Sequence, residues 1–105
     1  MRQFITTDDS GYWKISTRHT TYYIINMNDL MFVRVPGRGR SITPMDNQWM
    51  QFTDIKCQLG SSMTIIIDYL AKNYIQSTDV TRIELMSDDQ IKNWLEGYMS
   101  GSKQL

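Results

Sequence analysis

The stretch YWKISTRHTTYYIINMNDLMFVRV, residues 12–35, decides the fold of this chain. From Trp13 to Thr17 every second residue is apolar or β-branched, which is the two-residue period of a strand with two unlike faces. Two further apolar runs follow, and the dipeptide Asn28-Asp29 between them tolerates positive φ and suits a tight hairpin turn. The stretch therefore predicts a three-stranded antiparallel meander.

Polar segments lie on both sides of this meander. The turn-forming residues between Asp8 and Gly11 indicate that residues 1–10 form a flexible arm. Pro36 ends the third strand. Residues 36–47 begin with an arginine- and glycine-rich run that has little apolar material to pack, so they predict an exposed loop.

Residues 48–86 predict the remaining strands. Residues 49–57 alternate weakly, whereas 63–70 form a strong β-type run that turns at Lys72-Asn73. The chain returns as a last strand, which we expect to be interrupted near Ser77-Thr78. Ile, Val and Thr together fill 25 positions and Ala fills one, a composition that favours strands over helices. We expect about six strands.

Residues 87–99 predict the one helix. Ser87 as N-cap and Gln90 three positions later form a capping box. The residues at i, i+3, i+4, i+7 and i+8 from the first apolar position form one stripe: Ile91, Trp94, Leu95, Tyr98 and Met99. Gly97 leaves two endings open, since it either lies inside the helix or stops it as the C′ residue. The stripe docks on the core or offers a surface to a partner.

These elements predict a single domain spanning residues 1–105, of the α+β class and mostly β. Its architecture is a curved antiparallel sheet or a partly open small barrel, with one C-terminal helix followed by a tail over 100–105. Eleven basic and eleven acidic side chains give a formal net charge of zero. A global attraction to nucleic acid or to an anionic membrane is therefore not expected, and any such binding must be local.

The single cysteine favours a reducing compartment, because it has no partner within the chain for a disulfide. The first residues show no apolar core of a signal peptide, and no run approaches the length of a membrane span. We expect a cytoplasmic protein with no membrane association.

Few residues offer catalytic or metal-binding chemistry. His19 lies in a predicted turn with no identified carboxylate or nucleophile, and Cys57 on a predicted strand is the type of unpaired cysteine that is usually buried. The adjacent acid pairs Asp8-Asp9 and Asp88-Asp89 suit a turn and a helix N-terminus. We expect no enzymatic activity, no metal and no cofactor.

A basic cluster is the most informative candidate site. Arg34, Arg38 and Arg40 fall within seven residues, and Lys14 and Arg18 belong to the first strand of the same meander. With Tyr12, Tyr22 and Trp49 on an outer face, they would form a platform for base stacking and phosphate contact. Three interpretations stay open: a solvated hairpin loop, a loop that contacts a protein, and a nucleic-acid site.

Several short motifs are shared with one group of proteins. They are Trp13-x-Ile15-x-Thr17-Arg18, Thr21-x-Tyr23, Arg34-x-Pro36-Gly37 and Cys57-x-x-Gly60-x-x-Met63. Over about residues 12–85 the chain resembles small uncharacterised β-rich proteins of actinobacteria and their phages. The resemblance implies a phage or prophage accessory protein, acting in the host cytoplasm, and carries no functional residue with it.

The favoured function is a non-enzymatic interaction module that binds a protein partner, for example an anti-defence factor that inhibits or modulates a host protein. One alternative is a small β-barrel that binds nucleic acid, for which the neutral net charge is the main difficulty. A second alternative is a structural protein that self-assembles, as a homo-oligomer, through a sheet edge.

Overall fold

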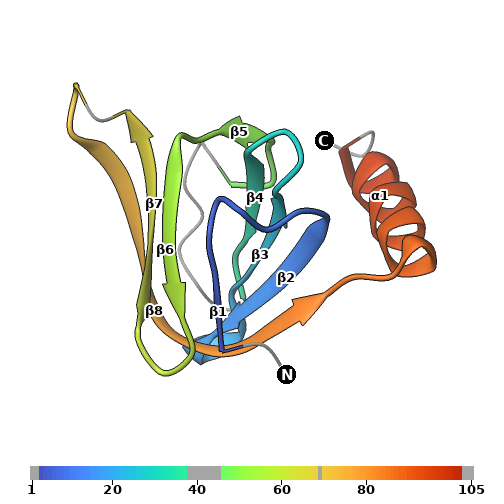
Figure 1. Cartoon of the computed structure of the whole chain (residues 1–105). Helices are drawn as coiled ribbons and strands as arrows, with labels where there is room; N and C mark the ends of the chain where they lie inside the picture. The colour runs from blue at the N-terminus through green and yellow to red at the C-terminus, as the bar shows by residue number, and fades with distance from the viewer. Residues whose placement is uncertain (1–2, 38–45, 69, 103–105) are drawn as a thin grey trace.

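The computed structural model describes residues 3–37, 46–68 and 70–102. Within them, eight strands form one open antiparallel sheet in the order β1-β6-β7-β8-β2-β3-β4-β5 (Figure 1). The elements are β1 (Phe4–Ile5), β2 (Tyr12–Thr17), the 3-10 helix η1 (Arg18–Thr20), β3 (Tyr22–Asn26), β4 (Met31–Val35), β5 (Met50–Gln51), β6 (Asp54–Gln58), β7 (Ser62–Asp68), β8 (Asn73–Leu85) and α1 (Asp88–Ser102). The chain is thus mostly β with one C-terminal helix, as predicted.

The expected count of six strands is wrong, because the described residues contain eight. Part of the predicted arm is the edge strand β1, which pairs with β6 and buries Ile5. The predicted strand over 49–57 is two strands, β5 and β6. Between them the chain changes partners: the Phe52 N–H donates to the Leu30 carbonyl and the Thr53 N–H to the Ile66 carbonyl. A single strand cannot pair along both ends of a curved sheet, so the run is split.

The meander β2-β3-β4 is confirmed, and so is the alternation that predicted it. Trp13, Ile15 and Thr17 are buried, while the residues between them are only half-buried. The turn between β3 and β4 is longer than the predicted dipeptide. The Asn26 side-chain oxygen accepts the N–H groups of Asn28 and Asp29, and the positive φ falls on Leu30. The turn is organised by the residue before it.

β8 is the central strand of the sheet and joins its two halves. Its first part pairs with β7, and its second part pairs with β2 in a register that sets Leu85 opposite Trp13. The interruption expected near Ser77-Thr78 is a register shift in a continuous strand, where the Ser77 hydroxyl accepts the Met63 N–H. β8 therefore carries the β7–β8 hairpin at one end and leads to α1 at the other (Figure 1).

The main core fills the concave side of the sheet. It draws side chains from β1 to β8 and from the turns between them: Ile5, Trp13, Ile15, Tyr23, Ile25, Met27, Phe32, Phe52, Ile55, Cys57, Met63, Ile65, Val80 and Ile83. Phe32 and Phe52 meet edge to face, with ring centroids 6.0 Å apart. Burial of this set is the main favourable term in folding.

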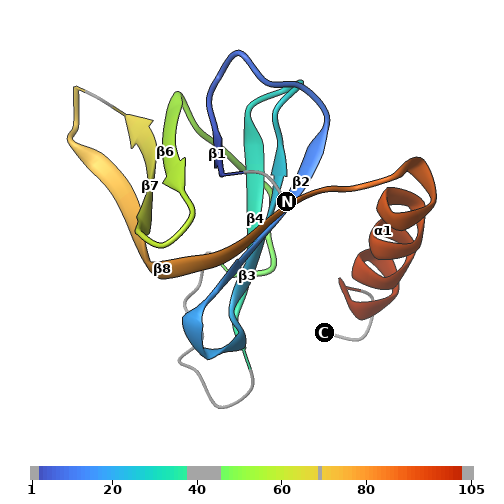
Figure 2. The ribbon, with the colours of Figure 1, turned by 60° about the horizontal axis from the view of Figure 1, so that its bottom comes forward.

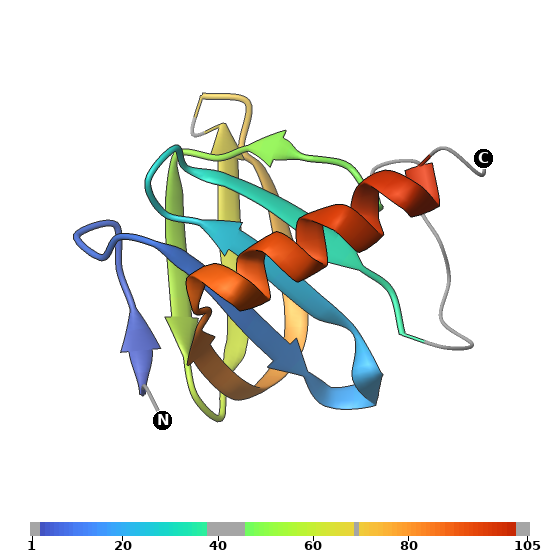
Figure 3. The ribbon, with the colours of Figure 1, turned by 90° about the vertical axis from the view of Figure 1, so that its right-hand side faces the viewer.

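The opposite side of β2, β3 and β4 is covered by α1, which crosses these strands diagonally (Figure 3). Ile24 and Val33 are fully buried yet lie outside the main core, because they alternate with its residues along β3 and β4. The capping box is confirmed: the Ser87 N–H donates to the Gln90 side chain, and the Gln90 N–H to the Ser87 hydroxyl. The helix continues through Gly97 to Ser102.

Candidate functional site

The turn after β2 places Arg18 at the surface. In η1 both His19 and Thr20 have φ near +70°, a conformation that costs energy for residues other than glycine. The turn is held by Thr17, whose N–H and hydroxyl both donate to the Thr21 carbonyl, at 3.0 and 2.7 Å. The Thr78 hydroxyl of β8 donates to the Arg18 carbonyl. Arg18 is therefore mounted on a turn fixed from two strands.

Arg34 of β4 lies close to this turn, on the concave side of the sheet, and is tied to Asp46. Its guanidinium donates to the Asp46 carboxylate at 2.6 Å, and the Asp46 side chain is 1% exposed. Partial burial alone would lower the pKa of Arg34, but hydrogen bonds to Asp46 and to the Tyr23 hydroxyl outweigh it and raise the pKa. Burial raises the pKa of Tyr23, and the contact with Arg34 opposes this. Both Arg34 and Asp46 thus remain charged at neutral pH.

The segment rich in arginine leaves and re-enters the described structure at this same place. The Gly37 N–H donates to the Thr21 hydroxyl, and Asn47, next to Asp46, donates its N–H to the Arg34 carbonyl. A side chain at position 37 would collide with the backbone of His19 and Thr20, so glycine is required there. Both ends of the segment between them are fixed beside Arg34.

We call this region the arginine end and define it by Arg18, Arg34, Gly37 and Asp46. An opening here is lined by two arginines and by hydroxyl and amide side chains, and no carboxylate is among its described lining residues, which are Thr17, Arg18, Thr21, Tyr23, Arg34, Ile75, Gln76, Ser77 and Thr78. The arrangement suits an anionic or hydrogen-bond-accepting group.

The predicted aromatic residues lie on the other side of the sheet, beneath α1. Trp49 meets Tyr12 and Trp94 edge to face, with ring centroids 6.3 and 5.9 Å away. The Trp94 indole N–H donates to the Tyr22 hydroxyl, and the Lys14 ammonium lies 4.7 Å from the Tyr22 ring centroid. These rings serve to dock the helix, which leaves their faces poorly placed for stacking with bases.

The structure thus separates the predicted site residues into two groups. Arg18 and Arg34 belong to the arginine end, whereas Tyr12, Lys14 and Tyr22 belong to the contact with α1. Arg38 and Arg40 lie outside the described residues. Sequence reasoning missed Asp46 as the partner of Arg34, and the only signal was an acid placed soon after the basic run.

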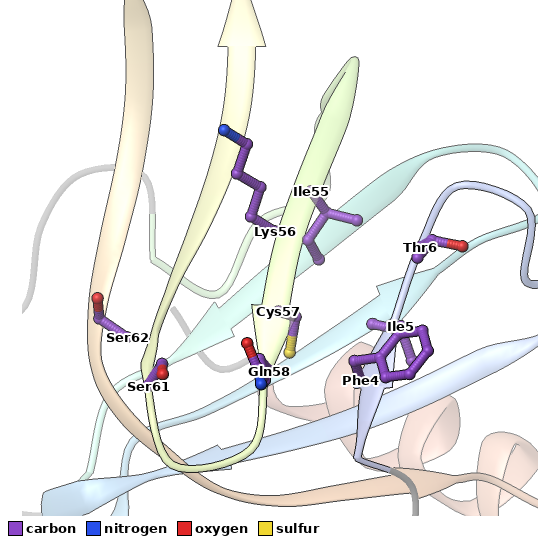
Figure 4. Close-up of a pocket in the computed structure, with 9 residues that line it drawn as sticks. All are labelled: Phe4, Ile5, Thr6, Ile55, Lys56, Cys57, Gln58, Ser61 and Ser62. Atoms are coloured by element: carbon purple, nitrogen blue, oxygen red, sulfur yellow. The ribbon is translucent and has the colours of Figure 1, made fainter.

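A second hollow lies between β1 and β6, with Cys57 in its wall (Figure 4). The Cys57 side chain lies on the same side of β6 as Ile5, its partner across the strand pair, and is buried. Burial raises the pKa of its thiol to about 12. No histidine or carboxylate is among the described residues that line this hollow, so nothing in them activates the thiol.

The remaining candidates have structural surroundings. His19 is exposed in η1. The Asp9 carboxylate accepts the Thr6 N–H in a turn, and Asp88 and Asp89 form the first turn of α1. Across residues 3–37, 46–68 and 70–102, no three His, Cys, Asp or Glu side chains gather in a group that would hold a metal ion.

Comparisons of the chain with models of protein families, with curated proteins and with solved structures found no match. The one helix in the described part of the chain is too short and too polar to cross a bilayer. The function is therefore argued from the geometry of the chain itself.

Proposed function

We propose that this protein is a non-enzymatic binding module that docks an acidic surface of a partner protein on its arginine end. The observation that carries the proposal is the meeting, at one edge of the molecule, of Arg18, Arg34 and both described ends of the segment that contains Arg38 and Arg40 in the sequence. Binding there would modulate the partner by covering its surface.

The backbone around Arg18 supports this assignment. Two consecutive non-glycine residues at positive φ are an uncommon cost, and they persist because Thr17, Thr21 and Thr78 hold the turn. A surface arginine on a rigid support loses little conformational entropy when it binds a carboxylate. Strain of this kind is more frequent at binding sites than elsewhere on a surface.

Arg34 contributes as a fixed positive group rather than as a free one. Its charge is balanced by Asp46, so the net positive charge available to a partner comes from Arg18 and from the arginines of the adjoining segment. Such charges, exposed at the rim of an interface, act mainly on the association rate and on its dependence on salt.

Nucleic-acid binding is the weaker alternative. It required aromatic rings beside the arginines, and Tyr12, Tyr22 and Trp49 instead pack against α1 on the other side of the sheet. What remains is a local positive region that would contact phosphates without stacking.

The test compares charge reversals in a pull-down from host lysate with purified, immobilised protein. The wild-type chain should retain a partner protein in stoichiometric amount. Arg18→Glu and Arg40→Glu should each lose it, while Lys56→Glu, a reversal on the exposed side of β6, should retain it. Retention by all three variants, or no stoichiometric partner in any cell background tested, would refute the proposal.

Fluorescence anisotropy with single-stranded DNA separates the alternative. Binding at low salt that weakens steeply as salt rises, and that Arg18→Glu abolishes, would favour a phosphate-led mode over a protein partner. We expect no binding that depends on Arg18.

A further inference from the structure

The β7–β8 hairpin ends in apolar side chains that nothing within the described chain covers. Leu70 is 97% exposed and Tyr74 is 58% exposed. The Asp68 carboxylate accepts the N–H groups of Leu70 and Ala71, so the turn is ordered by its own hydrogen bonds. We define the hairpin tip by Leu70, Lys72 and Tyr74. It is a narrow projection with an apolar end and a positive charge.

A groove runs along α1 where the chain passes from β8 into the helix. We define the α1 groove by its apolar residues Leu85, Ile91 and Leu95 and by the acids Asp88 and Glu96. Leu85 is 60% exposed, and the two other apolar residues, on the helix, are half-buried. The helix docks through its aromatic contacts, which leaves this side of it uncovered in the described structure.

The two surfaces are complementary in charge as well as in shape. The carboxylates of Asp88 and Glu96 outnumber the one ammonium of the groove, that of Lys92. At the hairpin tip Asp68 is engaged within the turn, which leaves Lys72 as its outward charge. A narrow apolar tip with a cation therefore matches an apolar groove with a net negative rim.

The tip of one molecule does not reach its own groove. The hairpin and α1 lie on opposite sides of the sheet in two views (Figures 1 and 2). We propose that the chain associates with itself head to tail, with the hairpin tip of one copy seated in the α1 groove of the next. The contact is heterologous, so it propagates into a ring or an open chain of copies rather than closing in a symmetric dimer. It leaves the arginine end free and does not depend on the proposed function.

A mixing experiment tests the head-to-tail arrangement. Sedimentation velocity should show the average mass of the wild-type chain rising with concentration. Leu70→Asp removes the apolar tip and Leu85→Asp puts a charge in the groove, and each change alone should weaken self-association by roughly tenfold or more. Mixed together, the two variants retain one intact tip and one intact groove, so they should form a one-to-one dimer and nothing larger.

Phe4→Asp is the matched control, since Phe4 is 53% exposed on the edge strand β1 and belongs to neither surface. It should assemble as the wild type does. A wild-type chain that stays monomeric at every concentration, assembly that survives both Leu variants, or a mixture that stays monomeric would each overturn the proposal.

A charge exchange gives a second readout that does not depend on replacing a leucine. Lys72→Glu and Glu96→Lys should each weaken assembly by repulsion between like charges. The double variant within one chain should recover it, because the tip is then negative and the groove positive. Failure of the double variant to recover would refute the pairing of these two surfaces.

Discussion

The indole N–H of Trp94 donates a hydrogen bond to the hydroxyl of Tyr22, with 3.2 Å between the nitrogen and the oxygen. This bond joins α1 to β3, elements that lie far apart in the sequence. It stands beside the ring contact between Trp94 and Trp49. Together the two contacts explain why Ile24 and Val33 are fully buried on the convex side of the sheet.

Replacing Trp94 should therefore loosen the helix. For Trp94→Ala we expect the free energy of unfolding to fall by about 2–3 kcal/mol, somewhat less than for a fully buried tryptophan, because this side chain is half-buried. Trp94→Phe should cost about 1 kcal/mol, mainly the lost hydrogen bond. Urea denaturation measures both, with the exposed Asn93→Ala on the same helix as a control. An unchanged stability in Trp94→Ala would mean that α1 does not dock in solution.

The capping box at the start of α1 gives an independent prediction. Ser87→Ala removes the hydroxyl that accepts the Gln90 N–H and should lower the free energy of unfolding by about 1 kcal/mol. Ser10→Ala is the matched control, because its hydrogen bond to the Trp13 indole is made by the backbone carbonyl. Thermal melts followed by circular dichroism report the difference. Equal melting temperatures for the two variants would contradict the cap.

The ion pair at the arginine end should be worth more than one on the surface. Asp46→Ala leaves the partly buried Arg34 without its carboxylate, and we expect a loss of about 2–3 kcal/mol. Glu84→Ala breaks the exposed pair with Arg82, where the charges are 3.6 Å apart, and should cost less than about 1 kcal/mol. Equal losses in urea denaturation would show that burial does not distinguish the pairs.

Cys57 predicts a loss of stability at alkaline pH. The pKa of its thiol is raised from 9.0 to about 12 by burial, so the folded state favours the protonated form. The resulting stabilisation is complete below pH 9 and declines as pH rises towards 12, since the unfolded chain releases the proton first. Unfolding free energies of the wild type should therefore fall more steeply over this interval than those of Cys57→Ala. Parallel pH profiles would mean that the thiol is not buried.

Local patterns were sufficient to predict much of the fold. The alternation from Trp13 to Thr17 and the capping box of Ser87 are written in neighbouring residues, and the structure follows both. β1 could not be found in this way, because Phe4 and Ile5 become a strand only by pairing with Gln58 and Cys57, far along the chain. The split between β5 and β6 has the same origin in distant partners.

The candidate site was harder to predict than the fold. The alternation along β2 correctly puts Tyr12 and Lys14 on one side, but it does not say that α1 covers that side. That depends on where the apolar stripe of the helix docks, which periodicity leaves open. The grouping of Arg18 with Arg34 rather than with the tyrosines likewise follows from strand pairing and from Asp46.

The position of β8 bears on how the protein is made. Translation reaches this strand last, yet it is hydrogen-bonded on one flank to β7 and on the other to β2, more than 60 positions upstream. A nascent chain still lacking residue 73 holds two partial sheets whose open flanks await a common partner. Productive folding must therefore wait for release from the ribosome, and during that interval the unpaired flank of β2 is exposed to chaperones and to other nascent copies.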